Sequence, residues 1–447
     1  MITERAKEFS VKWSACLQDF DESQHLCDLK SFRDQYICDH RFRDELMQDL
    51  TSVLNSTYPL LSTVDIQAFL PSPFHDKWHL TDELHELPRR LHNILSLENS
   101  YRLYLKSLKP TYAGWSEWRG LQINRLAIED ASFRSSHITH IPFAIELTDG
   151  CSGGCQFCGV SAPPLKPYHA RFCENQFLFR SLLENLLELC GTIACTGCLY
   201  WATDPFDHVD YEDYAAAFQS TLGLWPITTT ALAEKHVSRL ISFLNLRESA
   251  DDRPWGLRCS LRSPSAYQTL FRQLTPLQRA KLILLPQYKG ALSKQANAGR
   301  AYKQLHDDEQ DDVGGTIACV SGLLVSLPRQ TIDLITPCLA EPNHPNGYRT
   351  IIQSRFTKDN LSDILQSVMN QLPCPPVRLD TELFLTIDAT QFRLYPFKAF
   401  PAIFDLMYHQ TFSLAGLIES MPSSLSSHVI MSYCLSLIQC GAIRIVV

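Results

Sequence analysis

Residues 143–162 have the sequence FAIELTDGCSGGCQFCGVSA, in which an apolar stretch leads into a glycine-rich loop with three cysteines. The apolar residues predict a buried strand. Cys151, Cys155 and Cys158 follow it within eight residues, so we expect the thiols at the carboxyl end of that strand. In α/β barrels this end of the sheet is where ligands and reactants meet. The stretch therefore predicts a strand of an α/β sheet with a thiol site beside it.

Downstream of this stretch, short apolar segments alternate with amphipathic helices. Further strands are predicted at 192–202, 225–230, 255–263 and 281–287, and residues 314–338 have the pattern of two strands joined by a short turn. Helices are predicted at 170–190, 211–222 and 231–246. Such alternation is typical of parallel strands joined by crossover helices. The expected fold class is α/β, with an open or closed barrel.

The two ends of the chain differ from this central region. Residues 1–135 have a helical and irregular pattern, with apolar residues at helical spacing. Prolines at 373, 375 and 376 predict a linker. The tail that follows has the pattern strand, helix, helix, helix, strand, which suits a small winged-helix-like module. We expect a helical N-terminal region at 1–135, a barrel at 136–350, and a linker with this module at 351–447.

Composition narrows the classes of partner. The chain has 447 residues, with 40 Lys and Arg against 48 Asp and Glu and a net charge of −8, which argues against a nucleic-acid partner. No apolar run approaches the ~20 residues that cross a bilayer, and the charged start lacks the apolar core of a secretory signal. We therefore expect a cytoplasmic protein with no membrane partner. Sixteen cysteines in that compartment predict buried thiols and a metal or redox site.

Three clustered thiolates leave one coordination position open. A structural zinc site closes all four positions with protein ligands, whereas a [4Fe–4S] cluster on three cysteines keeps one iron free for a small molecule. The glycines around the thiols allow tight turns and close approach of backbone N–H groups. The alternative is a zinc knuckle completed by Cys195 and Cys198.

The spacing C-x-x-x-C-x-aromatic-C resembles the radical S-adenosylmethionine (radical SAM) superfamily. The resemblance implies a partial (β/α)6 barrel and a [4Fe–4S] cluster on Cys151, Cys155 and Cys158. It also implies that the free iron holds the amino and carboxylate groups of SAM, and that an external electron donor drives cleavage to a 5′-deoxyadenosyl radical. Phe157 matches the aromatic residue that lies near the adenine.

Other segments match the SAM-contacting positions of this superfamily. The segment Ala202, Thr203, Asp204 and Pro205 stands where a short motif contacts the SAM amino group, with Asp204 as its acidic member. Thr229, Ser260 and Arg262 lie at the ends of later predicted strands and offer hydroxyl groups and a cation for the ribose and carboxylate. The alternative is that these are ordinary strand-end residues.

Longer phrases between about 118 and 349 resemble the radical SAM peptide epimerases that act on ribosomal precursor peptides of the proteusin type. They include WRGLQINR, YWATDPFDHVDYEDY and IACVSGLLV; one departure is His208, where Asn is expected. The resemblance implies conversion of L- to D-residues by removal of a Cα hydrogen and return of another from the opposite face. The alternative is another radical SAM peptide-modifying enzyme that catalyses cross-linking, methylation or backbone excision.

Return of the hydrogen requires a donor with a weak bond to hydrogen, such as a thiol. Cys338, predicted at the end of a strand, is the first candidate, and Cys319, predicted in the middle of a strand, is the second. Tyr267 and Tyr348 are further alternatives, and each thiol could instead be an ordinary core residue. The partner expected is a precursor peptide, whose leader the C-terminal module could bind by strand addition. The alternative is that this module descends from a DNA-binding domain and has only a structural role.

Overall fold

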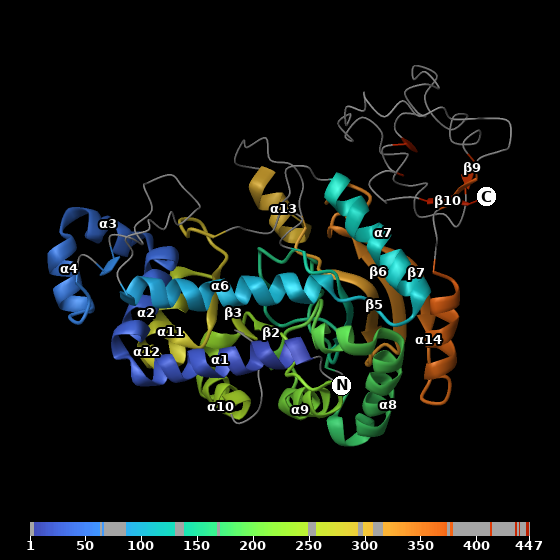
Figure 1. Cartoon of the computed structure of the whole chain (residues 1–447), viewed down its shortest axis with the longest axis horizontal. Coiled ribbons are helices and arrows are strands. Elements are labelled where there is room, and N and C mark those ends of the chain that lie inside the picture. Colours follow the sequence, from blue (N-terminus) through green and yellow to red (C-terminus); the bar gives the residue numbers. More distant parts are fainter. Residues whose placement is uncertain are drawn as a thin grey trace, which may run out of the picture.

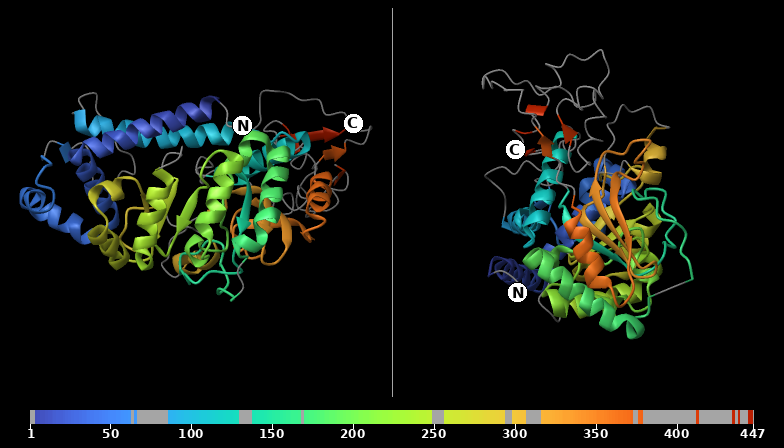
Figure 2. Two further views of the ribbon diagram at one scale, coloured as in Figure 1. Left: turned by 90° about the horizontal axis from the view of Figure 1, so that it is seen from below. Right: turned by 90° about the vertical axis from the view of Figure 1, so that its right-hand side faces the viewer.

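The computed structural model describes residues 4–62, 65–66, 86–129, 138–167, 170–248, 256–293, 298–306 and 316–372, with short pieces at 376–378, 412–413, 434–435, 438 and 444–446. Figures 1 and 2 show an elongated arrangement in which the first helices occupy one end and the last strands of the main sheet the other. The fold is mixed α/β, as the alternation of apolar strands and amphipathic helices predicts.

The main sheet has the strand order β1-β5-β6-β7. Strand β1 (Ile141–Glu146) pairs in parallel with β5 (Val320–Ser326). The antiparallel strands β6 (Thr331–Pro337) and β7 (Tyr348–Arg355) extend the sheet beyond β5. The predicted pair of strands at 314–338 is thus confirmed as β5 and β6. Strand β7 spans residue 350, where the barrel was expected to end.

A second sheet continues on the other side of β1. Strands β2 (Thr228–Thr230), β3 (Leu257–Leu261) and β4 (Ile283–Pro286) are parallel to one another. Cys198 joins the two sheets, because it forms parallel bridges with Ala144 of β1 and with Ile227 just before β2. Within the described ranges β4 pairs only with β3, and β7 only with β6. The described strands therefore form an open array rather than a closed barrel.

The strand predicted at 192–202 is wrong except at Cys198. Residues Gly191–Thr196 form the 3-10 helix η2, which holds Cys195. Gly191 ends the preceding helix with φ of 63°, a conformation that breaks an extended run and favours glycine. At Gly197 a Cβ atom would lie 2.3 Å from the ring of Phe143. The close approach of β1 thus needs a glycine there and leaves room for a single bridge instead of a strand.

Helices lie between and after these strands along the chain, as the crossover pattern predicts. They are α8 (Phe172–Cys190), α9 (Tyr211–Leu222), α10 (Val237–Glu248), α11 (Pro264–Gln273), α12 (Pro276–Ala280), α13 (Gly299–His306) and α14 (Leu361–Asn370). Short 3-10 helices η3 (Pro205–Asp207) and η4 (Ala233–Lys235) lie in the connections. In β3, Leu257, Cys259 and Leu261 are buried while Arg258 and Ser260 are less so. The helices therefore bury one face of β3, and the polar side chains occupy the other.

The N-terminal region is helical, as expected. It consists of α1 (Glu4–Glu22), α2 (Gln24–Cys38), α3 (His40–Gln48), α4 (Leu50–Thr57), α6 (Glu86–Ser107) and α7 (Ala113–Glu129). Residues 42–56 have apolar residues at helical spacing, but they form two helices, α3 and α4. The chain divides at Asp49, which caps α4 by accepting a hydrogen bond from the Ser52 N–H. Buried Lys30 of α2 pairs with Asp34 and donates to the Leu282 carbonyl before β4, which ties this region to the sheet.

The described pieces of the C-terminal tail include strands β8 (Pro376–Arg378), β9 (Phe412–Ser413) and β10 (Arg444–Val446). They form a parallel sheet in the order β10-β8-β9. Residues 434–435 and 438, within the last helix expected there, are helical; the rest of the expected helices lies outside the described residues. No helix in the described ranges is both long and apolar enough to cross a membrane.

Candidate functional site

The three clustered cysteines lie in a loop that leaves β1 and returns to α8. Backbone hydrogen bonds join its two arms: the Cys151 N–H donates to the Pro163 carbonyl (2.9 Å) and the Lys166 N–H to the Asp149 carbonyl (2.8 Å). Gly150 has φ of 92°, and a Cβ there would lie 2.3 Å from the Pro164 carbonyl oxygen. The loop is therefore a folded element whose first turn requires glycine.

Gly153 lies between two of the sulfur atoms. A Cβ built on it would be 3.2 Å from Cys151 Sγ and 3.3 Å from Cys155 Sγ, so both thiols face the same backbone position. The Gly153 N–H donates to Cys151 Sγ (3.2 Å), and the Ala162 N–H donates to Cys158 Sγ (3.3 Å). Such donors favour the thiolate form, which is the form that binds metals.

Without a metal, burial favours the protonated form of the Cys151 and Cys155 thiols. Burial raises the pKa of Cys151 to about 12. The hydrogen bond from the Gly153 N–H lowers this pKa, and the charges of Asp204 and Asp207 raise it. Burial raises the pKa of Cys155 to about 11, opposed by Arg262 and Arg300 and reinforced by Cys158. Thiols in such surroundings lose their protons when a cation replaces them.

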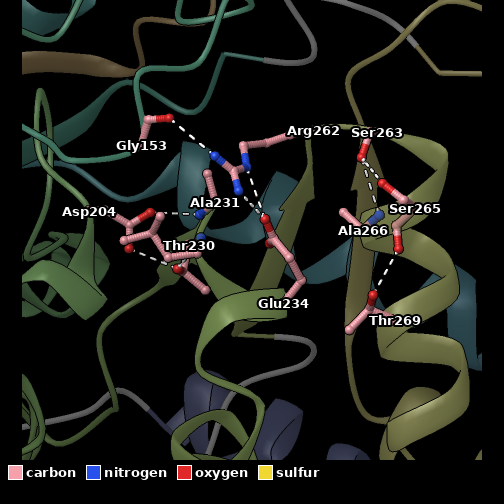
Figure 3. A network of polar contacts seen from close by, with 11 residues as sticks. Gly153, Asp204, Thr230, Ala231, Glu234, Arg262, Ser263, Ser265, Ala266 and Thr269 are labelled. Carbon is pink, nitrogen blue, oxygen red and sulfur yellow. Dashed lines mark hydrogen bonds and ion pairs between the residues drawn. The ribbon is translucent and has the colours of Figure 1, made fainter.

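Arg262 connects the cysteine loop to the end of β3. Its guanidinium donates to the Gly153 carbonyl (3.3 Å) and forms an ion pair with Glu234 (Figure 3). The sequence predicted a SAM contact for Arg262, and that role stays a prediction. The contacts in the structure place the cation between the loop and the 3-10 helix η4.

Arg300 holds the other side of the same loop. Its Nε donates to the Cys155 carbonyl (2.9 Å) and its Nη1 to the Ala162 carbonyl (2.7 Å). Its backbone N–H donates to the Cys158 carbonyl (3.0 Å). Gly299 allows this approach, because a Cβ there would lie 2.5 Å from the Cys158 carbonyl oxygen. The first turn of α13 is thus fitted against the cysteine loop.

Asp204 is a buried carboxylate with three donors around it. Its Oδ1 accepts from the Phe206 N–H (2.9 Å). Its Oδ1 also accepts from the Thr230 hydroxyl (2.8 Å) and its Oδ2 from the Ala231 N–H (2.6 Å), as Figure 3 shows. Burial raises the pKa of Asp204 to about 6 despite these bonds. Asp204 therefore ties the segment after Cys198 to the end of β2. Its predicted contact with SAM is untested by these bonds.

The neighbours of Asp204 have separate anchors. The Ala202 N–H donates to Glu146 (3.1 Å), the last residue of β1, and the Thr203 hydroxyl accepts from the Trp201 N–H (3.4 Å). Phe157 is half-buried in the cysteine loop. The predicted SAM contacts of Ala202, Thr203 and Phe157 likewise stay predictions.

A second polar group lies on the less buried face of β2 and β3. Thr229 Oγ1 is 2.9 Å from both the Tyr200 hydroxyl and Arg258 Nε, and Arg258 Nη2 donates to the Tyr200 hydroxyl (2.8 Å). Ser260, two residues beyond Arg258, has the same partly buried position on β3. Thr229 and Ser260, both predicted as ligand contacts, therefore lie on one face of the sheet.

The candidate hydrogen donors lie at the start of β5 and the end of β6. Cys319 is not in mid-strand as predicted: it precedes β5, is partly exposed, and its carbonyl accepts from the Ile141 N–H (2.7 Å). Cys338 follows β6 and is buried. Burial raises the pKa of Tyr200, and Cys319 contributes in the same direction, so this thiol lies near the polar group on β2 and β3.

Cys338 is connected to the cysteine loop by backbone contacts. Its N–H donates to the Gly347 carbonyl (3.0 Å), and in the same turn the Pro345 carbonyl accepts from the Gly299 N–H (2.6 Å). Gly299 in turn lies against the Cys158 carbonyl. Both donor candidates remain predictions, and these contacts connect Cys338 to the loop only through the backbone of Gly347, Pro345 and Gly299.

The other candidates have different surroundings. The Tyr267 hydroxyl is buried and has no hydrogen-bond partner among the described residues, and burial raises its pKa. Tyr348 packs against Trp201 edge to face, with ring centroids 5.5 Å apart. Burial raises the pKa of Cys259 to about 12 and of Cys190 well above its ordinary value, as expected of core thiols. Cys195 and Cys198 are also buried.

Several contacts of the loop were not predicted from the sequence. Asp207 accepts from the Ser152 N–H (2.8 Å), and Glu146 pairs with Arg329. Arg300 lies in the sequence NAGRA at 297–301. That an arginine stands there does not indicate that its side chain reaches two carbonyl groups of the loop. Asp207 could have been suspected, since it repeats the carboxylate of Asp204 three residues later.

The three loop thiols can be compared with the ligands that different metal centres require. Within the described ranges, no three His, Cys, Asp or Glu side chains lie close enough together to bind one metal ion. A [4Fe–4S] cluster requires a wider spacing of the thiols, because each thiolate binds a different iron and the thiolate sulfur atoms lie farther apart. The loop has three thiols and two backbone N–H donors, and two arginines hold it in place. This arrangement is compatible with a [4Fe–4S] cluster.

No protein-family model matches the chain. It is 33% identical over 295 residues to the uncharacterized protein y4wI of Sinorhizobium fredii (strain NBRC 101917 / NGR234), a match that covers 62% of this chain and 56% of that protein. The chain thus spans about half the length of this curated relative.

Among solved structures, the chain is similar to the crystal structure of BtrN in complex with AdoMet and 2-DOIA. The match has 12% identity and a TM-score of 0.29, and it covers 43% of this chain and 71% of that chain. At this TM-score the likeness carries no argument about fold or function. What the structure defines is a mixed α/β protein with a folded three-cysteine loop at the carboxyl end of a parallel strand.

Proposed function

We propose that the protein is a radical SAM enzyme whose [4Fe–4S] cluster is bound by Cys151, Cys155 and Cys158. The observation that carries the proposal is the position of Gly153 between two of the three sulfur atoms at the end of β1. The C-x-x-x-C-x-aromatic-C spacing supports it. When bound, the cluster and SAM supply a 5′-deoxyadenosyl radical.

The residues around the loop have separate tasks in this proposal. Arg262 and Arg300 keep the loop against β3 and α13 through its carbonyl groups. Asp204 fixes the segment with Ala202 and Thr203 beside the loop, where we propose that it receives the SAM amino group. Phe157 offers a half-buried ring for the adenine.

We further propose that the reaction is epimerisation of residues in a ribosomally made precursor peptide. The sequence phrases between 118 and 349 support this finer assignment. A Cα–H bond of the peptide breaks, and its hydrogen passes to the deoxyadenosyl carbon. A thiol on the opposite face, Cys338 or alternatively Cys319, then gives its hydrogen to the planar carbon. An external electron donor and a proton restore the thiol.

The cluster is tested by replacing all three loop cysteines with Ala. The anaerobically reconstituted triple variant is expected to lose its bound iron and sulfide, its visible absorption and its cleavage of SAM, because no thiolate remains to hold the metal. Iron and sulfide at wild-type levels in this variant would contradict the proposal.

The reaction is tested with a candidate precursor peptide. In D2O each inverted residue is expected to gain one deuterium, since a thiol hydrogen exchanges with solvent before it is delivered. The alternative is a different radical SAM peptide modification. Gain of a methylene group, loss of two hydrogens or loss of backbone atoms would point to methylation, cross-linking or excision.

A further inference from the structure

A pocket lies on the sheet next to the turn between β5 and β6. Its volume is about 560 Å3, and it is lined by Arg329, Thr331, Asp333, Gln353, Ser354 and Arg355. All six come from β6, β7 and the turn before β6. Since β7 pairs only with β6 among the described strands, the pocket lies beside an edge of the main sheet.

Asp333 gives the pocket its acceptor. Asp333 is only 8% exposed, and its Oδ1 has no hydrogen-bond partner among the described residues. Gln353 stands opposite it on β7. A buried carboxylate oxygen without a donor costs free energy, so this atom is suited to an N–H group from outside the described chain.

Two arginines give the pocket its donors. Arg329 is fixed by Ser326, to which its Nε donates (3.0 Å), and by its ion pair with Glu146 at the end of β1. Arg355 is exposed, and its guanidinium group has no hydrogen-bond or ion-pair partner among the described residues. Guanidinium groups can only donate. A ligand of this pocket therefore meets one unpaired carboxylate oxygen and flanking guanidinium donors, beside the hydroxyl and amide groups of Thr331, Ser354 and Gln353.

This combination selects the chemistry of the ligand. A simple anion would be repelled by buried Asp333, and a simple cation would be repelled by the two arginines. A primary amide satisfies both sides, because its NH2 group donates to a carboxylate and its carbonyl accepts from a guanidinium. An open edge strand beside the pocket is suited to a peptide that adds as a further strand.

We propose that this pocket binds the carboxamide side chain of an Asn or Gln in a peptide that lies along β7. The proposal rests on the proposed function only in that the substrate is a peptide. The ion pair of Arg329 with Glu146 places the pocket beside the end of β1, five residues before Cys151. A side chain held here fixes the register of the peptide relative to the cysteine loop.

The test uses the full-length chain and short fluorescein-labelled peptides of sequence Thr-Val-Thr-Xaa-Thr-Val-Thr, with Asn, Asp or Leu at the central position. Fluorescence anisotropy gives each Kd. The Asn peptide is expected to bind about tenfold more tightly than the others, as a hydrogen bond to a charged group implies. Equal binding of the three peptides overturns the proposal.

A substitution provides the sharper test. Asp333→Asn removes the charge and supplies an N–H donor, so the preference should change from the Asn peptide to the Asp peptide. Arg355→Gln should weaken binding of both. Arg272→Gln, which changes an exposed residue of α11, is the matched control that should not. An unchanged ratio of Asn to Asp binding in Asp333→Asn overturns the proposal, whatever its stability.

The same preparations distinguish this proposal from the proposed function. SAM cleavage by the reconstituted wild-type protein is measured beside peptide binding. Selective binding without SAM cleavage supports the pocket and contradicts the radical SAM assignment. SAM cleavage with unselective binding overturns the pocket alone.

Discussion

Arg300→Gln removes the side-chain contacts that hold the cysteine loop against α13. Two hydrogen bonds are lost, to the carbonyl groups of Cys155 and Ala162, while the backbone bond to Cys158 can persist. A bond from a charged donor contributes about 1.5–3 kcal/mol when buried. Because Arg300 is partly exposed, we expect about 1 kcal/mol for each bond. The sum of ~2 kcal/mol corresponds to about a 30-fold change.

The assay follows the decay of visible absorption after EDTA is added to anaerobically reconstituted protein. Arg300→Gln should lose its iron up to about 30 times faster than the wild type, since the loop opens more often. Arg300→Lys, which keeps the charge but not the two-pronged geometry, should be intermediate. Arg272→Gln should match the wild type. If Arg300→Gln also decays at the wild-type rate while remaining folded by circular dichroism, the arginine does not hold the loop.

Three further outcomes follow from the same contacts. Gly153→Ala should fold but bind less iron in reconstitution, because its Cβ would press on two sulfur atoms; full iron content would refute this. Asp204, with its pKa raised from 3.8 to about 6, stabilises the fold below about pH 4. That contribution of ~3 kcal/mol should vanish as the pH rises through 6, visible in urea unfolding as a pH slope that Asp204→Asn lacks. Cys338→Ala should still cleave SAM but form no D-residues, with Cys319→Ala as the control; D-residues from Cys338→Ala would exclude this thiol as donor.

Much of the central fold could be predicted because its signal is local. The apolar runs that became β1, β3 and β4 are short and bounded by helices with clear periodicity. The exception at 192–202 has equally apolar residues. There the deciding contact is between Gly197 and the ring of Phe143. Because Phe143 belongs to β1, the local sequence around Gly197 does not indicate this contact.

The candidate site divides in the same way. The three cysteines could be found from their spacing, because adjacent ligands on one loop form a motif. The groups that hold this loop come from β3 and α13, as Arg262 and Arg300 show. Such pairs are set by tertiary packing, and neither the type of residue nor its neighbours in sequence reveals them.

The pairing of β1 with β5 has a consequence for the order in which the protein can be assembled on the ribosome. It joins residues 141–146 to residues 320–326, so the strand that leads into the cysteine loop keeps an unpaired edge until most of the chain has been synthesised. Long-range parallel pairing of this kind forms slowly and leaves the nascent edge open to other chains. The loop reaches its final support on α13 at nearly the same moment, since Gly299 and Arg300 precede β5 by only about twenty residues. Insertion of the proposed cluster into the finished loop would therefore be a late event in the life of the chain, after translation has passed β5.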